Sequence, residues 1–194
     1  AIKSADLSLP DGAGLIWAFK LLGVKIQERI TGIDFMKSLC QIAQHRNIPI
    51  FLLGGTPEVV EEAASSLLKD HPNLRIAGFH HGYFSQDEDD RVCGMINESG
   101  ARILFVGLGV PKQELWIKSN LERLKGIVAI GVGGSFDVIS GRLKRAPEIW
   151  QRMGLEWLYR TIQEPWRLKR IIRLPIFMAL VILTRFGLYS RRID

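Results

Sequence analysis

Short aliphatic runs alternate with amphipathic stretches along the first 145 residues, and glycine stands at most of the junctions. The aliphatic runs have the length and composition of strands in a parallel sheet that is buried on both faces; they span residues 5–9, 48–53, 74–79, 103–107 and 127–132. The stretches between them carry apolar residues at helical spacings of three or four; they span residues 15–22, 35–44, 57–69, 88–99 and 112–124. This alternation predicts an α/β fold, with a Rossmann-like parallel sheet flanked by helices.

One of these helices has a clear start signal. Thr56 suits the N-cap, Pro57 suits the first helical position, and the charge of Glu58 favours the positive end of the helix dipole. We therefore expect this helix to begin at Pro57.

The character of the chain changes after Arg145. Trp150, Trp157 and Trp166 stand among arginines, and no further strand pattern occurs. We expect two domains: residues 1–145 as the Rossmann-like domain and residues 146–194 as a helical, basic appendage. Pro165 and Pro175 should divide this appendage into three helical pieces, because each proline disfavours helix in the residue before it.

The net positive charge is concentrated in the C-terminal segment that begins at residue 142. Of the 26 Lys and Arg residues, 12 occur from residue 142 onward, but only 4 of the 20 Asp and Glu residues do. Such a segment suggests an anionic partner, which can be a phosphorylated lipid, a membrane surface or a nucleic acid. Its longest uncharged apolar run, residues 174–184, is shorter than the roughly 20 residues that a membrane-spanning helix needs.

The two cysteines, Cys40 and Cys93, do not form a CxxC pair. A disulfide framework or a structural zinc site is therefore not expected, and a reducing cytoplasm suits the chain.

Three glycine-rich turns follow three of the predicted strands, and they contain Gly54 and Gly55, then Gly107 and Gly109, then Gly133 and Gly134. The carboxyl ends of parallel strands meet at one edge of a sheet, where backbone N–H groups and helix N-termini can hold a diphosphate. The alternative is that these glycines only permit tight turns. Neither a GxGxxG nor a GxxxxGK[ST] fingerprint is present.

Polar residues next to these turns are candidates for chemistry. Asp11, after the first predicted strand, could act as a general base, although Pro-Asp-Gly is also an ordinary turn sequence. Gln113 could hydrogen-bond a ligand and Lys112 could balance a phosphate, or both could simply face water at a helix start. Asp137 could contact a ribose or act as a base, or be a solvated acid in a first helical turn.

A series of short motifs runs through the chain in a specific order. They are Leu9-Pro10-Asp11-Gly12, Glu28-Arg29-Ile30-Thr31-Gly32-Ile33-Asp34, Phe51-Leu52-Leu53-Gly54-Gly55, Gly82-Tyr83-Phe84, Gly109-Val110-Pro111-Lys112-Gln113-Glu114, Gly131-Val132-Gly133-Gly134-Ser135-Phe136-Asp137 and Arg145-Ala146-Pro147. Together they resemble the WecG/TagA/CpsF family of bacterial glycosyltransferases, which is glycosyltransferase family 26, over nearly the whole chain.

The resemblance implies an inverting hexosyltransferase of the TagA type. Its donor would be UDP-N-acetylmannosamine or the corresponding uronic acid, and its acceptor an undecaprenyl-diphosphate-linked GlcNAc in teichoic acid or other surface polysaccharide synthesis. It further implies that Asp11 is the catalytic base and that Gln113 lies close to the donor sugar. The uridine diphosphate would be held by the glycine turns with Thr56 and Lys112, by Asp137 and by Tyr83. No metal or other cofactor is expected.

The same resemblance implies that the appendage brings the enzyme to the cytoplasmic face of the membrane and completes the site through Arg160, Arg167 and Arg170. A solvated basic face over a small hydrophobic core is the structural alternative for these arginines. Family members also carry a further segment ahead of the position of Ala1, so the resemblance predicts that the N-terminal part of the catalytic domain is missing here.

Two other classes of protein remain as alternatives. A dinucleotide-binding oxidoreductase would use the same kind of sheet, but it would need the fingerprint turn that this chain lacks. A non-catalytic module that binds membranes or nucleic acid through the basic segment would leave the glycine turns unexplained, and we expect no nucleic-acid partner. The exact sugar, the pathway and the presence of a homo-oligomer stay open.

Overall fold

The computed structural model describes residues 5–25, 30–168, 172–186 and 188. Its contacts divide the chain into two compact units. The first unit contains residues 1–8 and 32–144, and the second contains residues 9–31 and 145–194. In this grouping, residues 9–31 belong with the C-terminal segment, whereas the sequence-based division placed them in a domain of residues 1–145.

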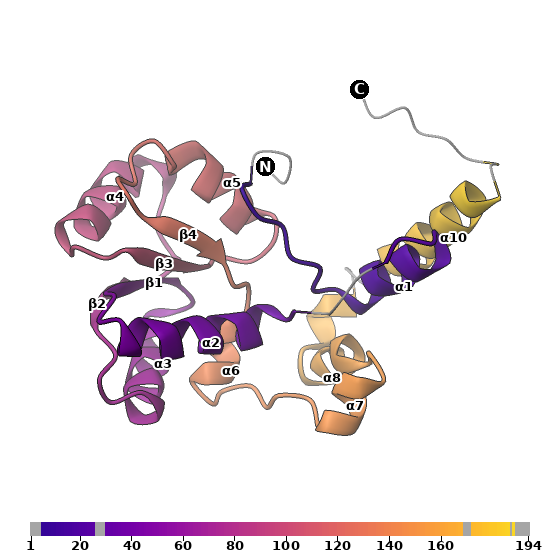
Figure 1. Ribbon diagram of the computed structural model, residues 1–194, viewed down its shortest axis with the longest axis horizontal. Helices are drawn as coiled ribbons and strands as arrows, with labels where there is room; N and C mark the ends of the chain where they lie inside the picture. Colours follow the sequence, from indigo (N-terminus) through magenta and orange to yellow (C-terminus); the bar gives the residue numbers. More distant parts are fainter. Residues whose placement is uncertain (1–4, 26–29, 169–171, 187, 189–194) are drawn as a thin grey trace. The chain divides into compact units, whose positions relative to one another are not determined.

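A four-stranded parallel sheet forms the centre of the first unit, with the strand order β2-β1-β3-β4 (Figure 1). The strands are β1 (Ile50–Gly54), β2 (Ile76–His80), β3 (Ile103–Gly107) and β4 (Val128–Gly131). Four of the five predicted strands are thereby confirmed, as is the α/β class with a parallel sheet.

The predicted strand at residues 5–9 is wrong. These residues lie outside the sheet, and residues 5–8 are exposed, with Leu7 exposed to 68%. In this run the polar residues Asp6 and Ser8 alternate with Ala5, Leu7 and Leu9. A parallel strand covered on both faces requires apolar side chains on both sides, and this run supplies them on only one.

The helices largely follow the predicted segments. They are α1 (Ala13–Leu21), α2 (Gly32–His45), α3 (Pro57–Asp70), α4 (Asp89–Glu98), α5 (Lys112–Asn120), α6 (Ser135–Ile139), α7 (Glu148–Arg152), α8 (Glu156–Gln163) and α10 (Arg173–Arg185), with the short 3₁₀ helices η2 (Gln86–Glu88) and η3 (Pro165–Arg167). As predicted, α3 begins at Pro57, and the Thr56 hydroxyl accepts a hydrogen bond from the N–H of Val59.

Helices cover both faces of the sheet (Figure 1). On one face, α2, α3 and α6 pack against Ile50, Leu52 and Phe105. On the other face, α4 and α5 pack against Leu53 and Leu104. Alternate residues of β1 and β3 thus enter opposite cores, which explains why these strands are continuously apolar.

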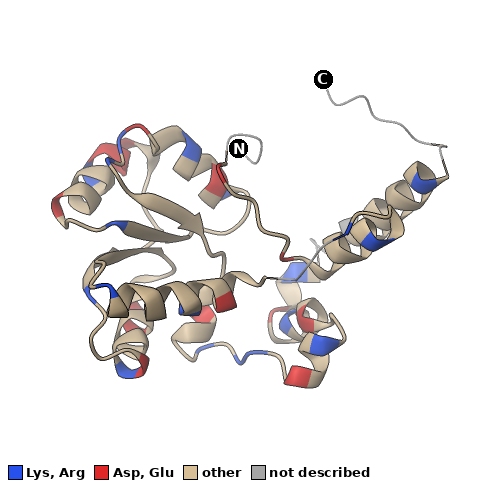
Figure 2. Cartoon of the chain, in the orientation of Figure 1, with Lys and Arg blue, Asp and Glu red and all other residues tan. Residues whose placement is uncertain are grey.

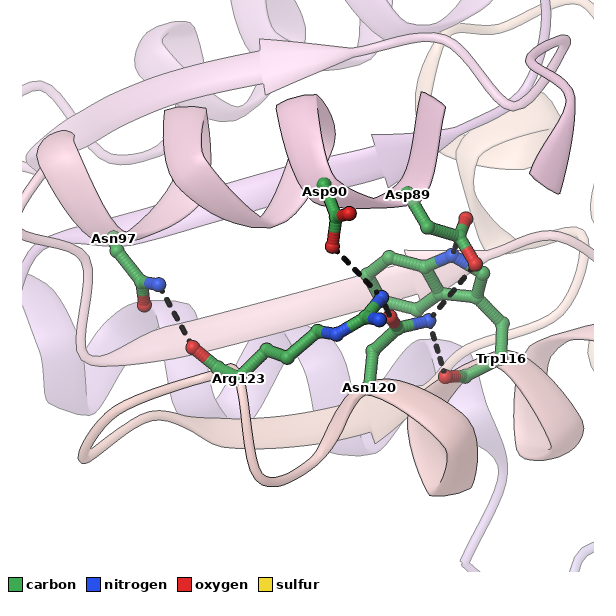
Figure 3. A network of polar contacts seen from close by, with 6 residues as sticks. All are labelled: Asp89, Asp90, Asn97, Trp116, Asn120 and Arg123. Atoms are coloured by element: carbon green, nitrogen blue, oxygen red, sulfur yellow. Dashed lines mark hydrogen bonds and ion pairs between the residues drawn. The ribbon is translucent and has the colours of Figure 1, made fainter. Parts of the chain in front are cut away.

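A buried polar network joins α4 to α5 on the second face (Figure 3). Trp116 Nε1 donates a hydrogen bond of 2.8 Å to Asp89 Oδ1, and Asn120 Nδ2 donates to Asp89 Oδ2 at 3.3 Å. Arg123 extends the network, because its guanidinium donates to Asn120 Oδ1 and forms an ion pair with Asp90. No local pattern in the sequence indicates this network. The helix α5 ends at Asn120, four residues before the predicted end.

The change Trp116→Phe should lower the free energy of unfolding by about 1–3 kcal/mol, because it leaves Asp89 Oδ1 buried without its donor. Chemical denaturation of the variant measures this change. A variant that is as stable as the wild type would contradict this stabilising role.

The second unit is helical. In it α1 lies beside α10, and Leu174 covers Gly14 so closely that an added Cβ would lie 2.9 Å from the leucine Cδ1. Trp150 of α7 makes an edge-to-face contact with Tyr159 of α8. Pro165 follows the end of α8, as expected, and Pro175 lies in the first turn of α10, where proline is tolerated. The prediction of three pieces is wrong, because a further break at Gly154, which has a φ of +71°, separates α7 from α8.

Candidate active site

The strand order reverses between β1 and β3, at the centre of the sheet. From β1 the chain moves to β2 on one side, and from β3 it moves to β4 on the other. In open α/β sheets, ligands bind beyond the carboxyl ends of the strands at such a reversal. Gly54 and Gly107 are the last residues of the two central strands, and they are paired in register.

These two glycines allow the two strand ends to approach closely. A Cβ on Gly54 would lie 2.5 Å from the carbonyl carbon and oxygen of Gly107, and Gly54 has a φ of +137°. A Cβ on Gly107 would lie 2.7 Å from the ring of Phe136 in α6. Both positions therefore require glycine because of their close surroundings, and Gly54 requires it for its backbone conformation as well.

The loop after β2 joins the same edge. The N–H of Gly82 donates to the carbonyl oxygen of Gly55 at 2.8 Å, and Lys112 Nζ donates to the carbonyl oxygen of Gly82 at 3.2 Å. Lys112 also lies over the ring of Phe84, 5.5 Å from its centre. The turns after β1, β2 and β3 are thus held together, and they place an ammonium group at this edge of the sheet.

Gln113 links this group to the turn after β4. Its side chain is 4% exposed, and its Oε1 accepts a 2.9 Å hydrogen bond from the N–H of Gly133. Its Nε2 donates to Oε1 of Glu114 at 2.7 Å. A Cβ on Gly131 would lie 2.6 Å from this Nε2, so a glycine at the end of β4 makes room for the amide.

Three glycines at this edge have left-handed backbone conformations. Gly55, Gly109 and Gly133 have positive φ values of +69°, +78° and +55°, and α3 and α5 begin within a few residues of the first two. Helix N-termini and successive backbone N–H groups favour phosphate oxygens. The Thr56 hydroxyl is engaged as the cap of α3 and also donates to Glu58 Oε2 at 2.7 Å.

Tyr83 and Asp137 lie at the margins of this group. Tyr83 is 73% exposed in the loop after β2, and its N–H donates to Nδ1 of His81. Asp137 is half-buried and lies in the first turn of α6, three residues after Gly134, which is the N-cap of this helix. The structure therefore brings the predicted residues of the three glycine turns, Lys112 and Gln113 together at one edge of one unit.

The remaining predicted site residues belong to the second unit. Asp11 is exposed and lies two residues before α1. Arg160 in α8 and Arg167 in η3 both form ion pairs with Glu164. Arg170 lies outside the described residues.

Sequence reasoning missed three residues that organise these groups: Gly82, Glu114 and Glu164. Gly82 and Glu114 belong to the same short motifs as the predicted site residues Tyr83 and Gln113, so the sequence did contain a signal for them. The signal for Glu164 was its spacing, four residues after Arg160 and three before Arg167, which allows both arginines to reach it along a helical path.

Comparisons with known proteins identify the family to which this chain belongs. The model of the glycosyl transferase WecG/TagA/CpsF family matches residues 1–191. A Bacillus subtilis (strain 168) protein named N-acetylglucosaminyldiphosphoundecaprenol N-acetyl-beta-D-mannosaminyltransferase is 39% identical over 181 residues, which cover 93% of this chain and 70% of the relative. A Staphylococcus aureus (strain MW2) protein of the same name is 39% identical over 177 residues, covering 91% of this chain and 69% of the relative. The chain therefore belongs to the glycosyl transferase WecG/TagA/CpsF family.

Proposed function

We propose that this chain transfers N-acetylmannosamine from a UDP donor to N-acetylglucosaminyl-diphosphoundecaprenol, with inversion at the anomeric carbon, in the synthesis of a teichoic-acid-type surface polysaccharide. The observation that carries the proposal is the buried side chain of Gln113. Its amide oxygen accepts a hydrogen bond from Gly133 in the turn after β4, next to the glycine turns that follow the central strands, where the strand order reverses. The family and the printed names of relatives at 37–39% identity support the choice of donor sugar and acceptor.

The proposed reaction is a single displacement. The acceptor hydroxyl oxygen forms a bond to the anomeric carbon of the donor, the bond from this carbon to the UDP oxygen breaks, and the hydroxyl proton passes to the Asp11 carboxylate. UDP leaves with the bonding electrons. Lys112 and the backbone N–H groups of the glycine turns stabilise the charge that develops on its diphosphate.

Release of UDP tests this function directly. The chain is incubated with UDP-N-acetylmannosamine and a short-chain GlcNAc-diphosphate-lipid, and free UDP is measured with and without the acceptor. Acceptor-dependent UDP release together with a disaccharide-lipid product supports the proposal. UDP release that is independent of the acceptor, or the absence of both turnover and UDP binding, contradicts it.

We also propose that transfer needs no metal ion, because the family resemblance implies that protein groups bind the diphosphate and stabilise its charge. Lys112 places an ammonium group at this edge. Turnover should therefore change by less than about twofold when EDTA is added in excess, whereas Mg²⁺-dependent leaving-group stabilisation would contribute several kcal/mol and would be lost. Loss of activity in EDTA that returns with added Mg²⁺ or Mn²⁺ would contradict the prediction.

Peripheral attachment to the cytoplasmic face of the membrane is a further part of the proposal. α1 and α10 contain Lys and Arg but no Asp or Glu, and apolar side chains such as Leu15, Ile176 and Leu183 are exposed on them (Figure 2). Basic and apolar residues together favour binding to anionic lipid surfaces. Among the described residues, no helix has both the length and the apolar character to span a bilayer.

Vesicle sedimentation measures this attachment. We expect the chain to pellet with vesicles that contain anionic phosphatidylglycerol and to remain largely in solution with pure phosphatidylcholine, because each basic residue near an anionic surface contributes about 1 kcal/mol. The change of the exposed Leu183 of α10 to Glu should reduce the pelleted fraction, whereas the change of the exposed Leu68 of α3 to Glu should not. Equal loss in both variants would contradict an attachment through α10.

A further inference from the structure

A buried carboxylate lies between two of the arginines of the second unit. Glu164 follows the end of α8, is 8% exposed, and stands directly before η3. Arg160 Nε donates a hydrogen bond of 3.0 Å to Glu164 Oε2, and Arg167 Nε lies 2.6 Å from the same oxygen. One carboxylate oxygen therefore holds two guanidinium groups that come from different elements.

The backbone reinforces this arrangement. The N–H of Glu164 donates to the carbonyl oxygen of Arg160 at 2.9 Å, and the N–H of Arg167 donates to the carbonyl oxygen of Glu164 at 3.0 Å. Both arginine side chains are about one quarter exposed. The three residues thus form one compact group at the junction of α8 and η3, and their formal charges sum to +1.

This geometry fixes the Arg160 guanidinium through a hydrogen bond and holds the Arg167 guanidinium close through an ion pair. A guanidinium is planar, so an interaction at Nε determines where its two Nη groups lie. Without the carboxylate, the two like charges would repel each other and each long side chain would adopt several rotamers. With it, the two planar groups are preorganised, and a bidentate arginine is well suited to phosphate oxygens.

Exposed apolar side chains border the same group. Ile162, Trp166 and Leu168 alternate with the charged residues along this segment, and all three are exposed. A cationic pair next to apolar surface matches a ligand that has an anionic head and a hydrocarbon chain. A diphosphate attached to a lipid has this chemistry.

We infer that Glu164 is a positioning residue, which holds Arg160 and Arg167 in the orientation that binds the diphosphate of the lipid-linked acceptor. The identity of this ligand rests on the proposed function. Glu164 itself does not touch the ligand, because its buried carboxylate is occupied by the two arginines.

Binding of farnesyl diphosphate in the presence of saturating UDP tests this inference, because UDP blocks the nucleotide site and no sugar transfer is required. The variants are Glu164→Gln, which keeps the shape but removes the charge, and Glu164→Asp, which keeps the charge. Glu148→Gln is the matched control: Glu148 also pairs with an arginine four residues away, Arg152, but both side chains are 81% exposed.

We expect Glu164→Gln to weaken farnesyl diphosphate binding about tenfold and to raise the KM for the lipid acceptor by a similar factor. UDP affinity and the KM for the sugar donor should not change, Glu164→Asp should recover part of the binding, and Glu148→Gln should behave as wild type. If Glu164 had a merely structural role, the Glu164→Gln variant would lose UDP affinity and acceptor binding together, with a rise in the KM for both substrates, or it would bind both ligands like the wild type.

Three results would overturn the inference: no binding of farnesyl diphosphate by the wild type, equal binding by wild type and Glu164→Gln, or a parallel loss of UDP and farnesyl diphosphate binding in that variant. Failure of the proposed function has a different signature. If the wild type binds farnesyl diphosphate and Glu164→Gln binds it tenfold more weakly, but no sugar is transferred, the positioning role is supported and the transfer reaction is contradicted.

Discussion

Replacing Asp11 by asparagine is expected to lower kcat for sugar transfer at least a hundredfold, with UDP affinity unchanged. A positioned general base contributes about 10²–10⁴-fold to a rate, and an amide cannot accept the hydroxyl proton. Asn has the shape of Asp, and Asp11 is exposed, so the fold should tolerate the change. The measurements are acceptor-dependent UDP release and calorimetric binding of UDP.

The matched control is Asp6→Asn, which removes an exposed carboxylate five residues earlier and should leave kcat at its wild-type value. An Asp11→Asn variant that retains more than about a tenth of wild-type kcat would contradict the role of base. A loss of kcat together with UDP affinity would instead indicate that Asp11 supports the nucleotide site.

Replacing Gly54 by alanine is expected to have the largest effect on stability. The new Cβ would lie 2.5 Å from the backbone of Gly107, and the residue would have to keep a φ of +137°. Backbone strain and overpacking together should cost about 3 kcal/mol or more, which corresponds to a fall in Tm of roughly 10 °C for a chain of this size. Since Gly54 and Gly107 end the two central strands, UDP binding should be lost as well.

Gly94→Ala is the control for this change. Gly94 lies within α4, and a Cβ built on it meets nothing within 4 Å. This substitution should therefore raise stability by about 0.5–1 kcal/mol, because alanine favours the helix. Thermal unfolding of both variants measures the difference, and a Gly54→Ala variant as stable as Gly94→Ala would show that the strand ends separate without cost.

The centre of the sheet could be predicted from the sequence because the strands β1 and β3 are buried on both faces. A short, continuous apolar run such as residues 103–107 has few structural alternatives to a buried strand, and a glycine or a helix-capping residue marks where it ends. The start of α3 was predictable for a similar reason, since Thr56 and Pro57 act on their own helix without help from the rest of the fold.

The failures share a different cause. Residues 5–9 have the apolar content of a strand, but a strand also needs a neighbour that covers its other face, and that depends on contacts distant in sequence. The break at Gly154 and the early end of α5 at Asn120 were missed because apolar periodicity continues past both positions. Local patterns locate elements better than they locate their ends.

The glycine turns were recognisable as ligand-binding candidates, but their mutual arrangement was not. The sequence determined that three glycine-rich turns follow three strands, that Gln113 opens a helix, and that the C-terminal segment is basic, because composition and spacing are properties of the chain itself. Only the tertiary structure decided that Gly54 touches Gly107, that Gln113 binds the N–H of Gly133, and that Glu164 holds two arginines. The contacts of Gly54 and Gln113 depend on strand order and helix packing, which bring together residues that are distant in sequence. The ion pairs of Glu164 depend on how the chain turns between α8 and η3.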